Sequence, residues 1–232
     1  YLMIDVAGFN WQMLVAVLAL PLVVYGYLFF GHELPKTERV TLGISTGDMW
    51  KAVGSPLFIF MGFCMLLTAS TELGTNQRID SLLQSTGVPA ILVLAFINGI
   101  MAIGRGFAGS VVHRLSSSGM LLFSAIFSFL GLIAMSYSSG AMTFVAAGLF
   151  AIGICYFWPT MLGFVSEKIP ASGALGLSVM GGLGMFSVSI VLPVMGRFMD
   201  TSATGAETLR YVAILPVILI VAFIFLFVRY RK

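Results

Sequence analysis

Apolar segments long enough to cross a bilayer recur along almost the whole chain, and they leave few folds open to it. Each runs for at least about 20 residues, the length that an α-helix needs to span the hydrocarbon core of a membrane. Hydrophobic residues make up 59% of the 232 residues and charged residues only 9%, unlike a water-soluble domain. The chain is therefore predicted to be an all-α integral membrane protein, because a helix satisfies its own backbone hydrogen bonds in lipid.

Seven of these segments are predicted to be transmembrane helices, at residues 11–31, 55–80, 88–112, 118–138, 141–166, 172–199 and 207–229. Most loops between them are short, so consecutive helices run antiparallel. A polar segment after the first span is the only sizeable linker. We expect residues 1–31 to hold one transmembrane helix, residues 32–54 to form a cytoplasmic linker between domains, and residues 55–232 to form a domain of six helices.

The positions of Lys and Arg predict how the chain is oriented, since cytoplasmic loops retain positive charge. If the spans alternate, most of these residues fall on one side: Lys36, Arg39, Lys51, Arg114, Lys168, Arg229, Arg231 and Lys232. Arg78, Arg197 and Arg210 fall on the other. We therefore expect a multi-pass protein of the plasma or inner membrane with a cytoplasmic carboxyl terminus. The pI near 9.0 reflects these flanking charges, and no nucleic-acid partner is expected.

Glu72 and Arg105 are charged residues inside otherwise apolar segments, and such residues usually mark a pathway, a binding site or a buried pair. Around Glu72, helical spacing puts Thr68, Thr75 and Asn76 on the same face, which predicts a polar stripe that lines a cavity. The alternatives are a pair with a neighbouring helix and a position at the outer headgroup level.

Arg105 lies two turns after Asn98 on one face of the third span, close to the helix end. A cation there is favoured by the helix dipole, so a structural and gating role is favoured over contact with a substrate. His113, in the basic turn that follows, is expected at the membrane interface. Direct contact between Glu72 and Arg105 would make both of them structural.

The fifth and sixth spans hold two further candidate features. Pro159 removes a backbone hydrogen bond and predicts a kink, beside which Tyr156, Trp158 and Thr160 could form a stacking platform for a sugar ring. The alternative is an aromatic belt at the interface. In the sixth span, glycines between Gly173 and Gly184 favour a thin, moving helix over a static packing seam.

These two spans, from Cys155 to Pro159 and from Gly173 to Asp200, resemble spans ten and eleven of major facilitator superfamily transporters. Within that superfamily they are most similar to the fucose/galactose–proton symporter group of sugar permeases. The stretch from Gly104 to Arg114 also resembles the superfamily's gating loop, with Gly109 and Arg114 matched and His113 where an acid is usual.

The resemblance implies that the seven spans are helices six to twelve of a transporter whose amino-terminal helices precede this chain. It implies a secondary active transporter that moves a small polar solute, expected to be a sugar, by alternating access, with proton coupling left open. The predicted substrate contacts are Thr71, Glu72, Asn76, Asn98, Tyr156, Trp158 and Thr160, and the predicted gating residues are Gly104, Arg105, Gly109 and Arg114.

Other classes of function remain open to different degrees. An efflux transporter for drugs or metabolites and a membrane subunit that transports nothing are the two alternatives. An enzyme is not expected, because His32 and His113 are the only histidines and neither belongs to a catalytic or metal-binding motif. Cys64 and Cys155 lie in apolar runs, so neither a disulfide nor a metal site is expected, and no cofactor is implied. The expected partners are the solute, the bilayer and the amino-terminal half.

Overall fold

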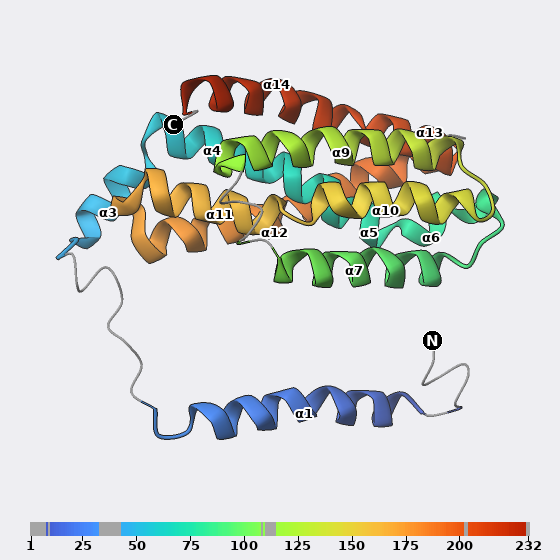
Figure 1. The fold of residues 1–232 in the computed structure, drawn as a ribbon, viewed down its shortest axis with the longest axis horizontal. Helices are drawn as coiled ribbons and strands as arrows, with labels where there is room; N and C mark the ends of the chain where they lie inside the picture. The colour runs from blue at the N-terminus through green and yellow to red at the C-terminus, as the bar shows by residue number, and fades with distance from the viewer. Residues whose placement is uncertain are drawn as a thin grey trace. The chain divides into compact units, whose positions relative to one another are not determined.

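Figure 1 shows the computed structural model of the chain, which describes residues 8, 10–32, 43–107, 109, 115–201 and 204–230. Its backbone contacts divide it into two units, Tyr1–Leu42 and Gly43–Lys232. The described elements are helices in both units, as the all-α prediction requires. Six of the described helices are long and apolar enough to cross a membrane, so the chain has the character of a multi-pass membrane protein.

The first unit contains helix α1 (Trp11–Phe29). The Asn10 side chain caps its amino end by accepting a hydrogen bond from the Met13 N–H at 3.0 Å. Large apolar side chains are exposed all around this helix, including Trp11, Leu18 and Val23. A helix that is apolar on every side is typical of a membrane span.

The second unit contains the remaining five candidate spans, several of which are built from more than one helical segment. They are Pro56–Gln77 (α4, Pro56–Ala69; η2, Ser70–Gly74; α5, Thr75–Gln77), Ser117–Tyr137 (α9), Met142–Lys168 (α10, Met142–Ile154; α11, Phe157–Lys168), Pro170–Asp200 (η4, Pro170–Ser172; α12, Gly173–Asp200) and Gly205–Arg229 (α13, Gly205–Val212; α14, Ile214–Arg229). Short helices α6 (Ile79–Leu82) and η3 (Gln84–Thr86) lead from the first of them to α7.

The predicted span at residues 88–112 corresponds to α7 (Ala90–Gly106), which has 17 residues. At about 1.5 Å per residue its length is about 25 Å, slightly less than the hydrocarbon thickness of a bilayer. Residues 108 and 110–114 lie outside the described part of the chain, and the description of α7 ends before them. Six spans are therefore supported, and the seventh stays a prediction.

Local sequence signals account for several helix ends. Ser55 caps α4, with Pro56 at the first helical position, where a missing N–H costs nothing. Thr204 and Glu207 form a reciprocal capping box at the start of α13. Ser116, the one described residue other than glycine with positive φ, caps α9 through the Gly119 N–H.

The predicted linker contains a short helix, α3 (Thr46–Val53), which contacts η4 and α12. Its Met49 is buried against Gly173, whereas Trp50 is exposed. The Ser45 hydroxyl donates to the Asp48 carboxylate at 2.6 Å and holds the pKa of that carboxyl below its ordinary value. Residues 43–54 therefore join the second unit, whereas residues 33–42 of the predicted linker lie outside the described part of the chain.

The core of the second unit takes buried side chains from α4, α7, α9, α10, α11, α12 and α14, and α9 contacts both α10 and α14 (Figure 1). Helices α9 and α10 approach most closely at two glycines. A Cβ on Gly131 would lie 2.4 Å from the Phe150 backbone, and one on Gly153 would lie only 2.2 Å from the Ser128 nitrogen. This pair of glycines, which we call the α9–α10 seam, lets the two backbones touch as small residues do in membrane bundles.

Candidate functional site

Glu72 and Arg105 form an ion pair within the second unit. The Arg105 Nη2 atom donates to Glu72 Oε1 at 3.1 Å, and the two residues are 33 positions apart in the chain. Glu72 is only 4% exposed, whereas the Arg105 side chain is 42% exposed. A carboxylate this deeply buried needs a partner, and the guanidinium supplies one while remaining accessible from one side.

This contact joins two charges that were predicted to have different roles, cavity lining for Glu72 and gating for Arg105. A structural role was expected of both residues if they touched, and the predicted roles in cavity lining and gating stay predictions. The pair is nevertheless not fully satisfied, because Glu72 Oε2 is buried and has no hydrogen-bond partner among the described residues. A carboxylate with one free oxygen can accept a further hydrogen bond or a proton.

Glu72 is carried by η2, a π-helical turn inside the span Pro56–Gln77. A π-helical turn widens the helix locally and is frequent at functional sites. It also shifts the faces that strict α-helical spacing predicts. Thr68, Glu72 and Thr75 are all buried, and so are their apolar neighbours Met65 and Ala69. The polar stripe therefore lies within the packed unit in this structure.

The hydroxyls near Glu72 fall into two groups. Thr68 and Thr71 donate to carbonyls of their own helix, at Met65 (3.1 Å) and Leu67 (2.8 Å), and so have no free donor. The Thr75 hydroxyl and the Asn76 side-chain oxygen are buried without a hydrogen-bond partner among the described residues. Buried polar atoms without a partner are costly, so a water molecule or ligand group that reached this part of the span could form hydrogen bonds with them.

Arg105 makes a second contact, at the break between α10 and α11. Its Nε atom donates to the Cys155 carbonyl at 3.1 Å. In a continuous helix that carbonyl would accept from the N–H four residues later, but the residue there is Pro159, which has none. The kink predicted at Pro159 is therefore present as a break at Cys155 and Tyr156, one turn earlier, and Arg105 occupies the freed acceptor.

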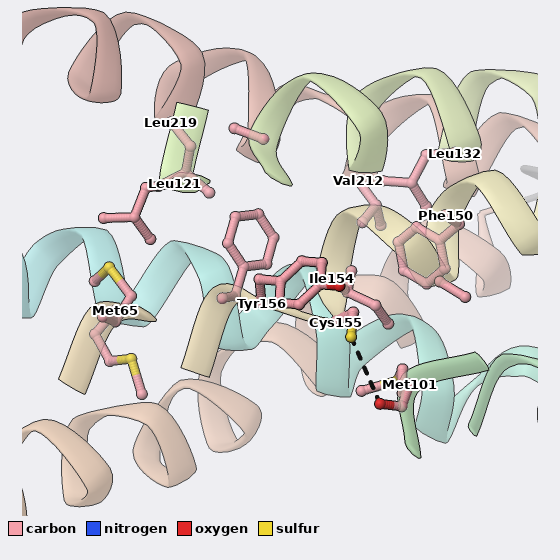
Figure 2. Close-up of a cluster of buried hydrophobic side chains, with 14 of the residues drawn as sticks. Met65, Met101, Leu121, Leu132, Phe150, Ile154, Cys155, Tyr156, Val212 and Leu219 are labelled. Carbon is pink, nitrogen blue, oxygen red and sulfur yellow. Dashed lines mark hydrogen bonds between the residues drawn. The ribbon is translucent and has the colours of Figure 1, made fainter. Parts of the chain in front are cut away.

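The break is held against α7 by a close contact at Gly104. A Cβ at Gly104 would lie 2.7 Å from the Cys155 sulfur, so only glycine fits there without movement. The Cys155 thiol donates to the Met101 carbonyl at 3.5 Å, which Figure 2 marks with a dashed line. Met101, Gly104 and Arg105 thus present one face of α7 to the break. We refer to Glu72, Arg105 and the Cys155 carbonyl as the ion-pair cluster.

The aromatic residues after Cys155 contact different helices. Tyr156 is buried, and its hydroxyl lies near Gly104 of α7. Trp158 is half-buried, and its indole packs against Gly184 of α12, where a Cβ would lie 2.5 Å from the ring. Thr160 is buried, and its hydroxyl lacks a partner among the described residues. The predicted platform is thus divided between α7 and α12.

The other predicted site residues lie outside the ion-pair cluster. Asn98 is exposed on α7 and donates to the Leu94 carbonyl of its own helix at 3.0 Å. Gly109 is exposed and has open space around it. Arg114, the last predicted gating residue, and His113 lie outside the described residues.

The glycines of α12 fall into two groups, those with close neighbours and those without. Gly176 and Gly184 meet close neighbours, Ser172 and Trp158, whereas Gly181 and Gly182 face open space. The helix is continuous from Gly173 to Asp200, with Pro193 inside it. Its close contacts are those of a packing seam, and its movement stays a prediction.

Sequence reasoning did not foresee the role of the Cys155 carbonyl or the Gly104 contact. The sequence does contain a signal for the Cys155 carbonyl, because Pro159 has no N–H to donate to the carbonyl four residues earlier. Within the described residues, no group of three or more His, Cys, Asp or Glu side chains is placed to hold a metal ion. Both cysteines are buried and free.

Comparisons of the chain with protein-family models, with curated proteins and with solved structures each found no match. The class that the described residues define is a helical, multi-pass membrane protein with a part-buried ion pair between its helices. The resemblance to the major facilitator superfamily stays a prediction.

Proposed function

We propose that the chain is the carboxyl-terminal half of a secondary active transporter that moves a small polar solute, a sugar being the first to test, by alternating access. The observation that carries the proposal is the ion-pair cluster, where a charged pair joins a π-helical turn to a broken helix. Transporters commonly place their binding sites at such interrupted helices, because freed backbone groups and charges can then face a solute.

The ion pair offers a way to couple a proton to a conformational change. Protonation of Glu72 removes the negative charge that attracts Arg105, and the Arg105 side chain is exposed enough to leave. Its departure would also free the Cys155 carbonyl at the helix break. Proton binding would thereby loosen α7 from both η2 and the break between α10 and α11, which is the kind of change that alternating access requires.

Uptake by the complete protein in proteoliposomes tests this role of Glu72. We expect Glu72→Gln to lower uptake at least about tenfold or to abolish its dependence on an imposed pH gradient, because the amide cannot ionise. Glu167→Gln is the matched control, since Glu167 pairs with its neighbour Lys168 and is exposed. Proton-coupled uptake that is unchanged in Glu72→Gln would remove Glu72 from the mechanism.

A further inference from the structure

An open apolar groove lies between α7, α9 and α10, away from the ion-pair cluster. Its volume is about 590 Å³, and apolar side chains make up most of its wall, among them Phe96 of α7, Ala134 of α9, and Val145 and Ile152 of α10. Val145 is 66% exposed, so the groove faces outward from the bundle. In a membrane protein, an exposed apolar surface of this kind can contact the acyl chains of the lipids.

The groove has the length of a single acyl chain. Along α10 its lining runs from Met142 to Ile152, a distance of about 15 Å at about 1.5 Å per residue. This is half of a hydrocarbon core about 30 Å thick, and so the depth of one leaflet. Where α9 ends, the lining changes to Tyr137, Ser138 and Ser139, residues with hydroxyl groups.

A cation that forms no ion pair with any described acidic residue lies at that same end. The guanidinium carbon of Arg210, on α13, lies 4.5 Å from the centre of the Tyr137 ring, which itself lines the groove. Arg210 is exposed, and none of the ion pairs between described residues includes it. A guanidinium is well suited to a phosphate, to which it can donate two parallel hydrogen bonds.

We propose that this groove binds one anionic phospholipid, with an acyl chain along α10 and the phosphate at Arg210. The position of the cation argues for a lipid rather than a partner helix. Arg210 lies at the hydroxyl-bearing end of the groove, where the headgroup of a lipid whose acyl chain follows α10 would lie. An anionic phospholipid has a net negative charge that Arg210 can neutralise. In phosphatidylcholine the choline cation already neutralises the phosphodiester. The proposal does not depend on the transport function.

Native mass spectrometry of the complete protein, released from nanodiscs of phosphatidylglycerol or of phosphatidylcholine, tests the proposal. We expect Arg210→Gln to weaken phosphatidylglycerol retention about fivefold, the usual contribution of one basic residue near an anionic surface, and to leave phosphatidylcholine retention unchanged. Arg229→Gln is the control, because Arg229 also lies over a tyrosine ring, that of Tyr230, at the far end of α14.

A second pair of variants tests whether the lipid binds in the groove, and it can be used even if Arg210→Gln fails to fold. Val145→Trp narrows the groove and is expected to reduce retention of both lipids, whereas Val221→Trp, at a site of nearly equal exposure (67%) on α14, is not. Equal retention by Arg210→Gln and Arg229→Gln, or by the two tryptophan variants, overturns the proposal. So does a change in oligomeric mass in Val145→Trp without a change in lipid, which would assign the groove to a second copy.

Discussion

Arg105 is the residue on which the candidate site depends, because one guanidinium serves two acceptors from different helices. Its Nη2 atom donates to Glu72 and its Nε atom to the Cys155 carbonyl. The planar fork of arginine allows both bonds at once, which a lysine ammonium on a flexible stem does not reproduce. Loss of Arg105 would leave the buried Glu72 charge without its partner, and such a loss costs more than the pair itself contributes.

A double-mutant cycle measures this coupling. We expect Arg105→Gln to lower the free energy of unfolding by about 1–3 kcal/mol, less than for a fully buried pair because the guanidinium is part-exposed. The variant Glu72→Gln/Arg105→Gln should lose less than the sum of the two single changes, since it leaves no buried charge. Thermal unfolding in one detergent provides the measurement, with Arg197→Gln as an exposed control. Additive losses would mean that the two charges do not interact.

At the scale of the helices, the glycines of this chain have two different functions, which their neighbours distinguish. Gly131 and Gly153 of the α9–α10 seam each lie against the backbone of the facing helix. Gly163 of α11 faces open space instead. The same residue type is therefore essential to packing in one helix and replaceable in another.

Alanine substitutions separate these two functions. Gly153→Ala would place its Cβ 2.2 Å from the Ser128 nitrogen, and we expect a loss of about 1–3 kcal/mol because backbone cannot yield as a side chain can. Gly163→Ala should leave stability unchanged or slightly higher, since alanine favours a helix. The midpoint of thermal unfolding reports both variants. A similar loss in the two would show that the seam does not depend on close contact.

At the scale of the whole molecule, two of the candidate spans are irregular along their length, and one residue contacts both irregular points. The span Pro56–Gln77 contains a π-helical turn, and Met142–Lys168 is broken in the middle. Both irregular points meet at Arg105 of α7. A ligand that binds here would favour one arrangement of these helices and would stabilise the fold by mass action.

A thermal-shift screen of the complete protein distinguishes the solute classes. We expect sugars to raise the unfolding temperature more than nucleosides, peptides or amphiphilic drugs, and the shift to be lost in Glu72→Gln. The control is the same screen on Glu167→Gln, which should respond as the unchanged protein does. Stabilisation by amphiphilic drugs rather than sugars would favour efflux, and the absence of any shift would favour a subunit that transports nothing.

The sequence alone determined the helical class of the fold, the approximate positions of six spans and several helix ends. Hydrocarbon permits few structures other than helices. Pro56, Pro159 and the pair Thr204 and Glu207 start or interrupt helices through residues that are close to them in the chain. It also identified Glu72 and Arg105 as unusual, since a charge in an apolar run is evident without coordinates.

Only the tertiary structure decided that these two charges touch, that Cys155 supplies the second acceptor for Arg105, and which glycines pack closely. Each of these contacts depends on how one helix is rotated about its axis against another. The π-helical turn at Ser70–Gly74 changes the rotation of the residues that follow it in the same span. Spacing rules assume a uniform helix, and so they place Glu72 on a stripe but cannot choose its partner 33 residues away.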